Sequence, residues 1–577
     1  MGCVDCIDAA PGDLGMLDEN PSAPAATEAA VSSHAATAPW WRGAVIYQVY
    51  PRSFADSNGD GTGDLPGLIG KLDYIASLGV DAIWVSPFYR SPMADFGYDI
   101  SDYRDVDPVF GTLADFDRLM AESHRRGLRV IVDQVLSHSS DRHPWFEESR
   151  RSRDNPKADW YVWADPQADG TPPNNWLSIF GGSAWQWEPR RGQYYLHNFL
   201  VSQPDLNYHN PQVAAQMLDE AEFWLQRGVD GFRLDAINFC FHDAQLRSNP
   251  AKPLAERKGR GYTIDNPYAA QYHLHDNTQP ETLGFVEQLR KLVDRYPGAM
   301  TLGEISCEDP FAAVRDYTAG DRRLHSAYCF ELLVDHFSTA HVRDVFATLT
   351  ARAPDFWPVW AVGNHDVARV ASRWSCEGVE PARRAKLLNA FLLSLRGTAC
   401  SYQGEELGLG EVSLPREALR DPYGVAFWPT FKGRDGCRTP MPWDARDPQG
   451  GFTRGQPWLP MPDEHRECAV SVQNADPASI LNAYRAMVKF RRAQPALRQG
   501  TMRLLDSTAE IIAVVREHAD QALLAAFNFG SAPARLTLPS RVETLSGHGF
   551  EPCVPGPGYV ELPAAGAFFA LLRTSKK

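Results

Sequence analysis

The sequence predicts an α/β protein built on a (β/α)8 barrel, the TIM barrel, with an inserted domain after the third strand and a C-terminal antiparallel β domain. From Trp40 onward, short apolar runs alternate with stretches of helical periodicity. The apolar runs are continuous rather than alternating with polar residues, which is typical of parallel strands buried on both faces. One long gap between apolar runs predicts the insertion, and a late change to short β-rich runs predicts the last domain.

The expected strands and helices follow each other in regular order. The first strand, residues 44–50, precedes a helical stretch at 65–78 that ends at Gly79. A second helix is expected over 113–126, with Gly127 as its end. The expected barrel strands are 44–50, 82–86, 128–135, 229–235, 299–304, 327–332, 356–362 and 398–402.

The expected domain boundaries follow from changes in composition and pattern. Residues 1–38, rich in Ala, Pro, Ser, Asp and Glu, are expected to form a disordered leader. The barrel is assigned to 39–138 and 204–498, with an inserted domain B at 139–203 that is rich in Trp, Asn, Gly and Pro. Residues 499–577 are assigned to a C-terminal β-sandwich domain.

Composition and charge exclude several kinds of partner. The net charge of −15 argues against nucleic acid and anionic membranes, and no apolar run is long enough to span a bilayer. The leader lacks the basic and apolar regions of a secretory signal. Cys3 and Cys6 form a C-x-x-C there without a second pair or partner histidines, so we expect no metal or redox role. The other cysteines are scattered, which favours reduced thiols and a cytoplasmic location.

Acidic and histidine side chains follow several of the expected strands. In a parallel barrel the carboxyl ends of all strands meet on one face, so these side chains should converge. Arg233 and Asp235 lie two residues apart and so on one side of their strand; alone, the pair could be a structural salt bridge. Asp133 lies inside a strand and is expected to be structural. The residues expected on this face are Asp99, Asp133, His138, Arg233, Asp235, Glu304, His365 and Asp366.

This set of side chains suits glycoside chemistry. One carboxylate can attack the anomeric carbon, while a second carboxyl group with a raised pKa protonates the leaving oxygen. The sequence has no glycine-rich phosphate loop, no G-x-S-x-G elbow and no H-E-x-x-H motif, so no organic cofactor is expected. The alternative of another class is a non-catalytic sugar-binding barrel, but a binding protein has no need of a general acid.

Five motifs, in their order and spacing, resemble the α-amylase superfamily, glycoside hydrolase family 13. The resemblance is strongest to the α-glucosidase and oligo-1,6-glucosidase branch and runs from about Trp40 to the end of the chain. It implies a retaining glycosidase. The motifs are DQVLSHSS (133–140), QPDLNY (203–208), GFRLDA (231–236), GE (303–304) and GNHD (363–366).

The resemblance also implies a role for each residue of the site. Asp235 would be the nucleophile, Glu304 the general acid/base and Asp366 the transition-state stabiliser. Arg233 would hold Asp235 ionised and oriented. Phe180 and Phe199 would narrow the pocket, although they could instead be core residues of the inserted domain. The remaining implied sugar contacts are His138 and His365 as hydrogen-bond donors, Tyr98 as a stacking ring, and Asp99 with Arg434, from a second insert at 404–442, as a clamp on the non-reducing-end glucose.

A separate loop at 56–64 carries oxygen-bearing side chains at every second position. It begins like a calcium loop, but Gly67 stands where an EF-hand has a bidentate glutamate. It resembles the metal loop after the first strand in the α-glucosidase branch, which implies a structural Ca²⁺ or Mg²⁺; the alternative is a turn without an ion. Ser137 replaces a calcium-binding asparagine of many amylases, so no calcium is expected at domain B. The implied ligands are Asp56, Asn58, Asp60, Thr62 and Asp64.

The implied function is an exo-acting, retaining α-glucosidase with transglucosylation activity. It would release terminal non-reducing α-1,4-linked glucose from maltose and short oligosaccharides, with sucrose as a further candidate. Ala236 follows the nucleophile, and alanine there accompanies α-1,4 rather than α-1,6 specificity in the branch. Two alternatives stay open, a maltose or sucrose isomerase such as trehalose synthase and an α-1,6-specific oligo-1,6-glucosidase. We expect a small α-glucoside as the partner, and a monomer or homodimer.

Overall fold

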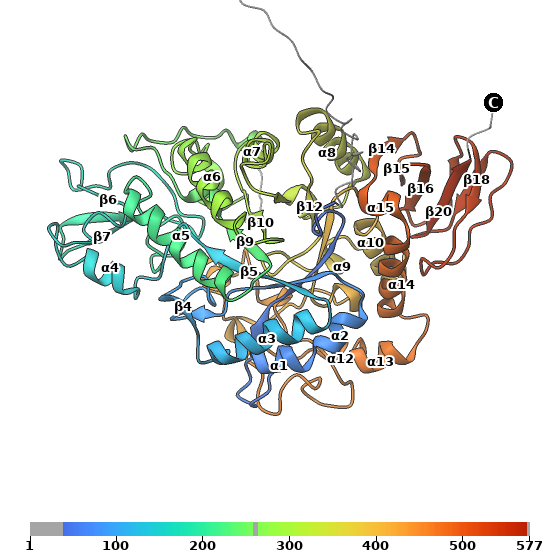
Figure 1. Ribbon diagram of the computed structural model, residues 1–577, viewed down its shortest axis with the longest axis horizontal. Coiled ribbons are helices and arrows are strands. Elements are labelled where there is room, and N and C mark those ends of the chain that lie inside the picture. Colours follow the sequence, from blue (N-terminus) through green and yellow to red (C-terminus); the bar gives the residue numbers. More distant parts are fainter. Residues whose placement is uncertain (1–37, 258–263, 574–577) are drawn as a thin grey trace, which may run out of the picture. The chain divides into compact units, whose positions relative to one another are not determined.

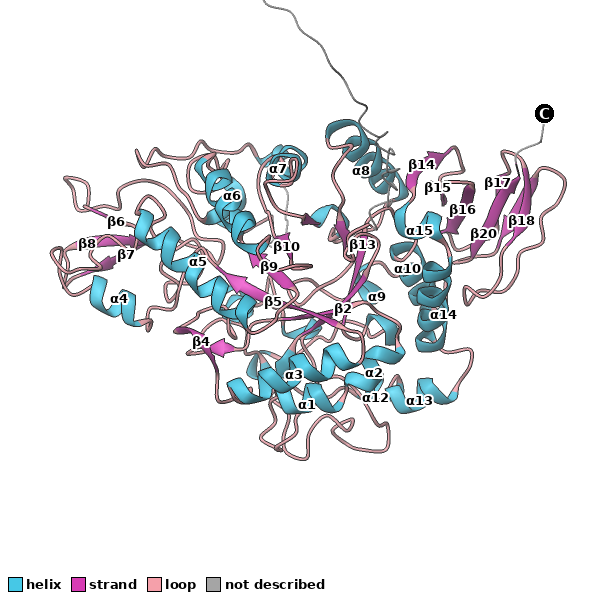
Figure 2. Ribbon diagram, in the orientation of Figure 1, coloured by secondary structure: helices cyan, strands magenta, loops and turns pink. Residues whose placement is uncertain are grey.

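A computed structural model describes residues 38–257 and 264–573. The expected leader at 1–38 lies outside the described residues except for Ala38. In the described part of the chain, eight parallel strands close into a barrel, which confirms the predicted fold class (Figures 1 and 2). In the order of their pairing, the barrel strands are β1 (Val45–Val49), β13 (Thr398–Tyr402), β12 (Val359–Trp360), β11 (Ser326–Cys329), β10 (Met300–Gly303), β9 (Gly231–Asp235), β5 (Arg129–Val135) and β2 (Ala82–Val85).

The continuous apolar runs are explained by burial of the barrel strands on both faces. Ile46, Trp84 and Ile131 come from three strands and belong to one cluster that fills the barrel interior. Their neighbours Val45 and Val130 belong to a second cluster, which packs the outer face of the barrel against the helices. Each fully buried side chain of this kind contributes roughly 1.5–3 kcal/mol of transfer free energy.

One of the two expected helices is interrupted. Residues 65–78 form two short helices, because Lys71, with φ −112° and ψ 6°, leaves the helical conformation between them. The helix expected at 113–126 is present and begins with a capping box formed by Thr112 and Asp115. The helices are α1 (Leu65–Gly70), α2 (Leu72–Ser77), α3 (Leu113–Arg125), α4 (Pro144–Ser149), α5 (Pro211–Gln226), α6 (Glu281–Val293), α7 (Pro310–Tyr317), α8 (Thr339–Arg352), α9 (Val370–Arg373), α10 (Pro381–Leu392), α11 (Pro422–Phe427), α12 (Asp463–Glu467), α13 (Val470–Ala475), α14 (Ile480–Ala493) and α15 (Pro495–Gln499).

Two excursions from the barrel supply loops to its carboxyl-terminal face. A short hairpin of β3 (Tyr89–Arg90) and β4 (Asp102–Val106) follows β2 and carries the loop between them. The insertion after β5 contains an antiparallel sheet in the order β6-β8-β7. Its small core holds the stacked rings of Trp176 and Trp185. The strands are β6 (Trp163–Ala164), β7 (Trp185–Glu188) and β8 (Gln193–Leu196).

The C-terminal residues form antiparallel sheets, as predicted. In the described part of this region, one sheet has the order β14-β15-β16-β20-β18 and the other pairs β17 with β19. Ile511 of the first sheet and Leu536 and Val560 of the second share one buried cluster, so the two sheets pack face to face. The strands are β14 (Thr501–Leu505), β15 (Ile511–His518), β16 (Gln521–Asn528), β17 (Ala534–Thr537), β18 (Arg541–Thr544), β19 (Tyr559–Leu562) and β20 (Ala567–Arg573).

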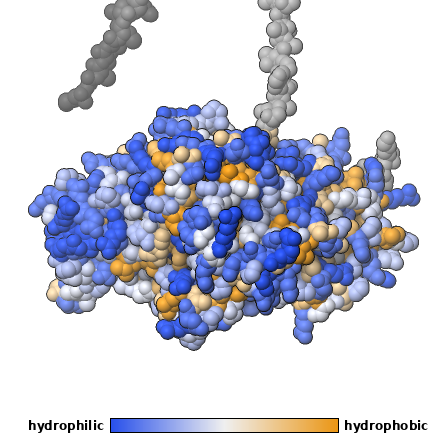
Figure 3. All heavy atoms as spheres, turned by 90° about the horizontal axis from the view of Figure 1, so that it is seen from below, coloured by the Kyte–Doolittle hydropathy of each residue, from blue (hydrophilic) through white to orange (hydrophobic). Residues whose placement is uncertain are grey.

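Among the described residues, no helix combines the length and the apolar character needed to cross a bilayer. On the face shown in Figure 3, hydrophobic residues occur in small areas among hydrophilic ones.

Candidate active site

The ends of β9 and β10 place two carboxyl groups on one guanidinium. Arg233 Nη1 lies 2.7 Å from Asp235 Oδ1 and 2.8 Å from Asp133 Oδ1, while Nη2 forms an ion pair with Glu304. The register between the strands sets Leu302 opposite Arg233 and Gly303 opposite Leu234, so Glu304 follows directly beside Asp235. The Arg233–Asp235 pair expected from their spacing is therefore present.

Burial raises the pKa values of Asp235 and Glu304 by different amounts. It raises the pKa of Asp235 to about 6, although Arg233 opposes this shift. Burial raises the pKa of Glu304 further, to about 8, because the neighbouring carboxylates of Asp235 and Asp366 add to it. Arg233 orients Asp235 as expected, but its charge does not overcome burial. Near neutral pH, the pair therefore holds one ionised and one protonated carboxyl group, which is the arrangement of a nucleophile beside a general acid.

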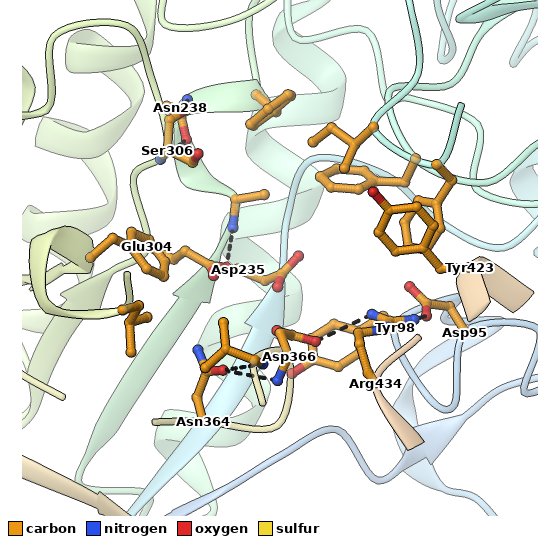
Figure 4. A pocket seen from close by; sticks show the side chains of 18 of the residues that line it. Asp95, Tyr98, Asp235, Asn238, Glu304, Ser306, Asn364, Asp366, Tyr423 and Arg434 are labelled. Carbon is orange, nitrogen blue, oxygen red and sulfur yellow. Dashed lines mark hydrogen bonds and ion pairs between the residues drawn. The ribbon is translucent and has the colours of Figure 1, made fainter. Parts of the chain in front are cut away.

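Asp366 is held in the ionised form from the opposite side of the pocket. Burial alone would raise the pKa of Asp366, but the guanidinium groups of Arg434 and Arg438 outweigh it, so the pKa lies below its ordinary value. Arg438 Nη2 lies 2.9 Å and Arg434 Nη1 3.2 Å from Asp366 Oδ1. Asn364 accepts hydrogen bonds from the backbone of the same turn. Figure 4 shows Asp235, Glu304 and Asp366 around one space.

The predicted histidines lie at different depths. His138 lines the pocket, whereas His365 lies behind Tyr98 and stacks on its ring at 5.4 Å with an angle of 3° between the planes. The Tyr98 hydroxyl lies 2.7 Å from His365 Nε2 and donates to Asp133 at 3.0 Å. Burial lowers the pKa of His138 to about 4 and that of His365 to about 3, so both rings are neutral. Gln48 Nε2 lies 2.8 Å from His365 Nδ1, and this hydrogen bond fixes the orientation of the ring.

The predicted partner of Arg434 is wrong. Asp99 does not contact Arg434; it is fully buried and accepts hydrogen bonds from the Ser91 hydroxyl and the amides of Ala94 and Asp95. Its carboxylate closes the loop between β3 and β4 and is therefore turned away from the pocket. Asp95, at the tip of this loop, pairs with Arg434 at 2.7 Å. The motif DFGYD holds both acids, and its spacing alone does not reveal which one faces the pocket.

The two aromatic residues from domain B do line the pocket. Phe180 lies 5.3 Å from the ring of Tyr423, which belongs to the insert after β13. Phe199 lies 5.0 Å from the ring of His138. Asn266 joins the two inserts, because its side-chain amide donates to the Ile179 carbonyl and the Tyr423 hydroxyl, both at 2.8 Å. The loops that carry Ile179, Asn266 and Tyr423 therefore contact one another where they cover the pocket.

Several further residues complete the pocket. Gln203 lies in the quoted motif QPDLNY, and its amide is 3.2 Å from both Asp95 Oδ2 and His138 Nε2. Arg438 lies in the same segment as Arg434 and is the second cation on Asp366. The place of Gln203 in its motif, and that of Arg438 in the insert that carries Arg434, could have singled them out. Asn364 also lines the pocket and lies in the quoted motif GNHD. Other lining residues came from loops without a quoted motif, namely Ile179, Asn238, Phe239, Ser306, Phe330, Glu331, Leu333, Val334, Val367 and Tyr423.

The loop at 56–64 forms a closed turn. Asp56 accepts hydrogen bonds from the amides of Asn58, Gly59 and Gly61, and Asp60 accepts one from the amide of Thr62. Asp64 caps α1 through the amide of Gly67 and also accepts from Ser57. The oxygen donors suit a hard cation in kind. However, no three acidic, histidine or cysteine side chains within the described residues are placed to hold a metal ion. Ca²⁺ or Mg²⁺ at this loop stays a prediction.

Known proteins with related sequences cover most of the chain. The alpha-amylase catalytic domain family model matches residues 48–500. A probable alpha-glucosidase of Rhizobium meliloti (strain 1021) is 54% identical over 536 residues, which is 92% of this chain and 97% of that protein. An oligo-1,6-glucosidase of Parageobacillus thermoglucosidasius is 36% identical, with 87% of this chain and 92% of that protein covered. The crystal structure of an alpha-glucosyl transfer enzyme, XgtA, matches with a TM-score of 0.91 and 60% identity, covering 93% of this chain and 100% of that one.

Proposed function

The chain belongs to the alpha-amylase family and is a glycoside hydrolase, and from that premise we propose that it is an exo-acting, retaining α-glucosidase. Its substrates would be maltose and short oligosaccharides with a terminal non-reducing α-1,4-linked glucose, and sucrose is a further candidate. The observation that carries the proposal is the pair of contacting carboxyl groups on Arg233, with the pKa of Asp235 below that of Glu304. A pair this close leaves no room for the water of an inverting enzyme.

The reaction would proceed in two steps. Asp235 attacks the anomeric carbon while Glu304 gives its proton to the leaving oxygen, so that a glucosyl–Asp235 ester forms and the remainder of the substrate departs. Glu304, now ionised, takes a proton from water or from a sugar hydroxyl, which then attacks the ester and releases Asp235. Attack by a sugar hydroxyl gives transglucosylation. Asp366, ionised and beside them, would stabilise the positive charge that develops on the sugar ring.

The closed end of the pocket supports cleavage from the chain end. Arg434 joins Asp95 and Asp366 there, and Asn266 ties domain B to the insert that carries Tyr423. A polysaccharide chain would have to pass through this wall to continue beyond the cleaved glucose. A single terminal glucose therefore fits the site better than the middle of a long chain.

The charge of the pocket favours a neutral sugar. Among the described lining residues, Arg434 is the single lysine or arginine, and it already contacts the carboxylates of Asp95, Asp366 and Asp421. Asp235, whose pKa is about 6, adds a further negative charge at neutral pH. A phosphorylated substrate would bring two negative charges to a site with no free cation, so we propose an unmodified glucoside.

The most specific part of the proposal is the preference for α-1,4 over α-1,6 linkages. Ala236 lines the pocket directly after Asp235. The α-1,4 preference rests on the resemblance to the branch, in which alanine or threonine at this position accompanies α-1,4 specificity and valine accompanies α-1,6 specificity. The alternatives are an α-1,6-specific oligo-1,6-glucosidase and an isomerase such as trehalose synthase. The non-catalytic barrel is not retained, because the family is that of a hydrolase and the acid and base are both present.

A comparison of products tests the proposal directly. Purified protein is incubated with maltose, isomaltose, sucrose, trehalose and maltotriose, and rates and products are measured by chromatography. Free glucose, formed fastest from maltose and maltotriose and initially as the α-anomer, is the expected result. Faster cleavage of isomaltose would favour the α-1,6 alternative, and trehalose formed from maltose would favour the isomerase.

Three further properties belong to this proposal. We propose that the loop at 56–64 holds a structural Ca²⁺ or Mg²⁺ through side-chain oxygens of the five predicted residues, with no part in bond cleavage. A cytoplasmic location is supported by the free thiols of the eight described cysteines. A monomer or homodimer is proposed, and light scattering coupled to size-exclusion chromatography distinguishes the two.

A further inference from the structure

We infer that Asp421 is a positioning residue that holds the guanidinium of Arg434 at the closed end of the pocket, although Asp421 itself does not face the sugar. The inference rests on the proposed exo-glucosidase function and deepens it, because it names a residue that controls affinity for the terminal glucose. Arg434 lines the pocket and Asp421 does not. Asp421 is fully buried behind it.

Three hydrogen bonds join the Asp421 carboxylate to Arg434. Asp421 Oδ2 accepts from Arg434 Nε at 3.1 Å and from the Arg434 backbone amide at 2.7 Å, and Oδ1 accepts from Nη2 at 2.8 Å. This two-pronged arrangement fixes both the position and the plane of the guanidinium. The remaining donors are thereby aimed at Asp95 and Asp366, at 2.7 and 3.2 Å.

The backbone around Asp421 is shaped for this contact. Gly433 has φ +78°, and a Cβ added there would stand 2.7 Å from Asp421 Oδ2. A Cβ added to Gly424 would stand 2.5 Å from the Lys432 carbonyl oxygen and 2.8 Å from Gly433 Cα, so the two chain segments touch at a pair of glycines. Asp435 accepts hydrogen bonds from the amides of Arg420 and Asp421 at 2.6 and 2.8 Å, which holds the carboxylate of Asp421 in place.

Loss of the Asp421 carboxylate would change how Arg434 divides its contacts among its acidic partners, which are Asp95, Asp366 and Asp421. Without Asp421, the two carboxylates left to Arg434 are Asp95 and Asp366, and both line the pocket. The guanidinium would then turn toward Asp366 and occupy oxygen atoms that should face the sugar. The expected consequence is weaker substrate binding, with the chemistry on Asp235 and Glu304 little altered.

Asp421 also has an ordinary structural role that the test must separate. Its side chain caps α11 by accepting from the amide of Tyr423 at 3.3 Å. Asparagine caps a helix about as well as aspartate. Asp421→Asn therefore keeps the cap but loses the charge-assisted fork to Arg434. Gly433→Ala disturbs the same contact from the other side and changes no charge.

The experiment is a double-mutant cycle on kcat and KM for maltose and 4-nitrophenyl α-glucoside. We expect Asp421→Asn to raise KM about 10- to 100-fold, the range for loss of hydrogen bonds between charged groups, with kcat within about threefold. Gly433→Ala should raise KM in the same direction. Because Asp421 would act through Arg434, Asp421→Asn should raise KM by less than about twofold when it is made in an Arg434→Ala background.

The control is Glu188→Gln in domain B. Glu188 is a buried acid with two arginine partners, Arg150 and Arg190, and it does not line the pocket. Its loss should lower the thermal midpoint without moving KM. An unchanged KM in Asp421→Asn, or an equal effect with and without Arg434, would overturn the positioning role. If Asp421→Asn does not fold, an unchanged KM in Gly433→Ala overturns it. Absence of glucose release by the wild-type enzyme would instead reject the proposed function.

Discussion

The two ends of the pocket are built in different ways. At one end, Asp235 and Glu304 stand at the carboxyl ends of neighbouring parallel strands, and Arg233 from within β9 contacts both. At the other end, Asp95 and Arg434 come from two loops that lie 339 residues apart in the chain. The first end is fixed by strand register, and the second is fixed by contacts between loops.

The difference teaches which parts of the site depend on distant structure. A strand end has few conformations open to it once the barrel has closed, because the backbone hydrogen bonds of both neighbours hold it. A loop tip has many conformations open to it, so side chains outside the strands must stabilise one of these conformations. Asp99 selects the conformation of the loop that carries Asp95, and Asp421 holds the side chain of Arg434.

The largest effect is expected at the strand ends. Asp235→Asn and Glu304→Gln should each lower kcat by at least about 10³-fold, because each removes a group on which bond cleavage depends. Glu304→Gln should keep far more activity on α-glucosyl fluoride than on maltose, since fluoride leaves without a proton. Steady-state kinetics measure both. Near-wild-type turnover of maltose by either folded variant would contradict the assignment.

An intermediate effect is expected where two neighbouring acids of one loop are compared. Asp95→Asn removes a charged partner of Arg434 and should raise KM for maltose about 10- to 100-fold. Asp99→Asn should lower the free energy of unfolding by about 1–3 kcal/mol, with KM changed by less than about threefold. Kinetics and urea unfolding of both variants check this. The reverse pattern would restore Asp99 as the sugar contact.

The pH dependence of activity tests the pair on Arg233. Asp235 must be ionised, so kcat/KM should fall as pH drops below about 6, where its carboxylate takes up a proton. Glu304 must be protonated, so kcat/KM should fall as pH rises above about 8. Each limb should approach a tenfold change per pH unit. Glu304→Gln on α-glucosyl fluoride should lose the alkaline limb, and persistence of that limb would assign it to another group.

A smaller effect is expected at the residue after the nucleophile. Ala236 has φ 42° and ψ 42°, and its amide donates to Glu304 at 3.2 Å. A β-branched residue is strained in this left-handed conformation, so Ala236→Val should cost about 1–3 kcal/mol of stability. It should also shift the isomaltose-to-maltose rate ratio a few-fold toward isomaltose. Ala236→Ser, small and unbranched, is the matched control. An unchanged ratio would remove Ala236 as a determinant of linkage.

The smallest effect concerns the loop at 56–64. If this loop holds a divalent cation, a chelator should lower the thermal midpoint by a few degrees, in line with the loss of ligand stabilisation, and leave kcat for maltose unchanged. Asp60→Asn should remove most of this response to the chelator. A thermal midpoint that is independent of both chelator and added Ca²⁺ or Mg²⁺ would identify the loop as a plain turn.

The sequence by itself determined the barrel and most of the positions of the acids. Continuous apolar runs can be buried in few ways other than as parallel strands, and the face on which Asp235, Glu304 and Asp366 meet follows from that topology. The division of 65–78 at Lys71 could not be seen, because the apolar periodicity continues across the break.

Only the tertiary structure decided the partners within the pocket. Whether Asp95 or Asp99 meets Arg434 depends on which one closes its own loop, and two aspartates four residues apart look alike in a sequence. The charge state of Asp235 was likewise decided by burial, which exceeds the effect of the Arg233 guanidinium beside it. Local patterns record which residues share a strand or a turn. Desolvation and contacts between distant loops depend on every element that surrounds a group, and they exist only once the chain has folded.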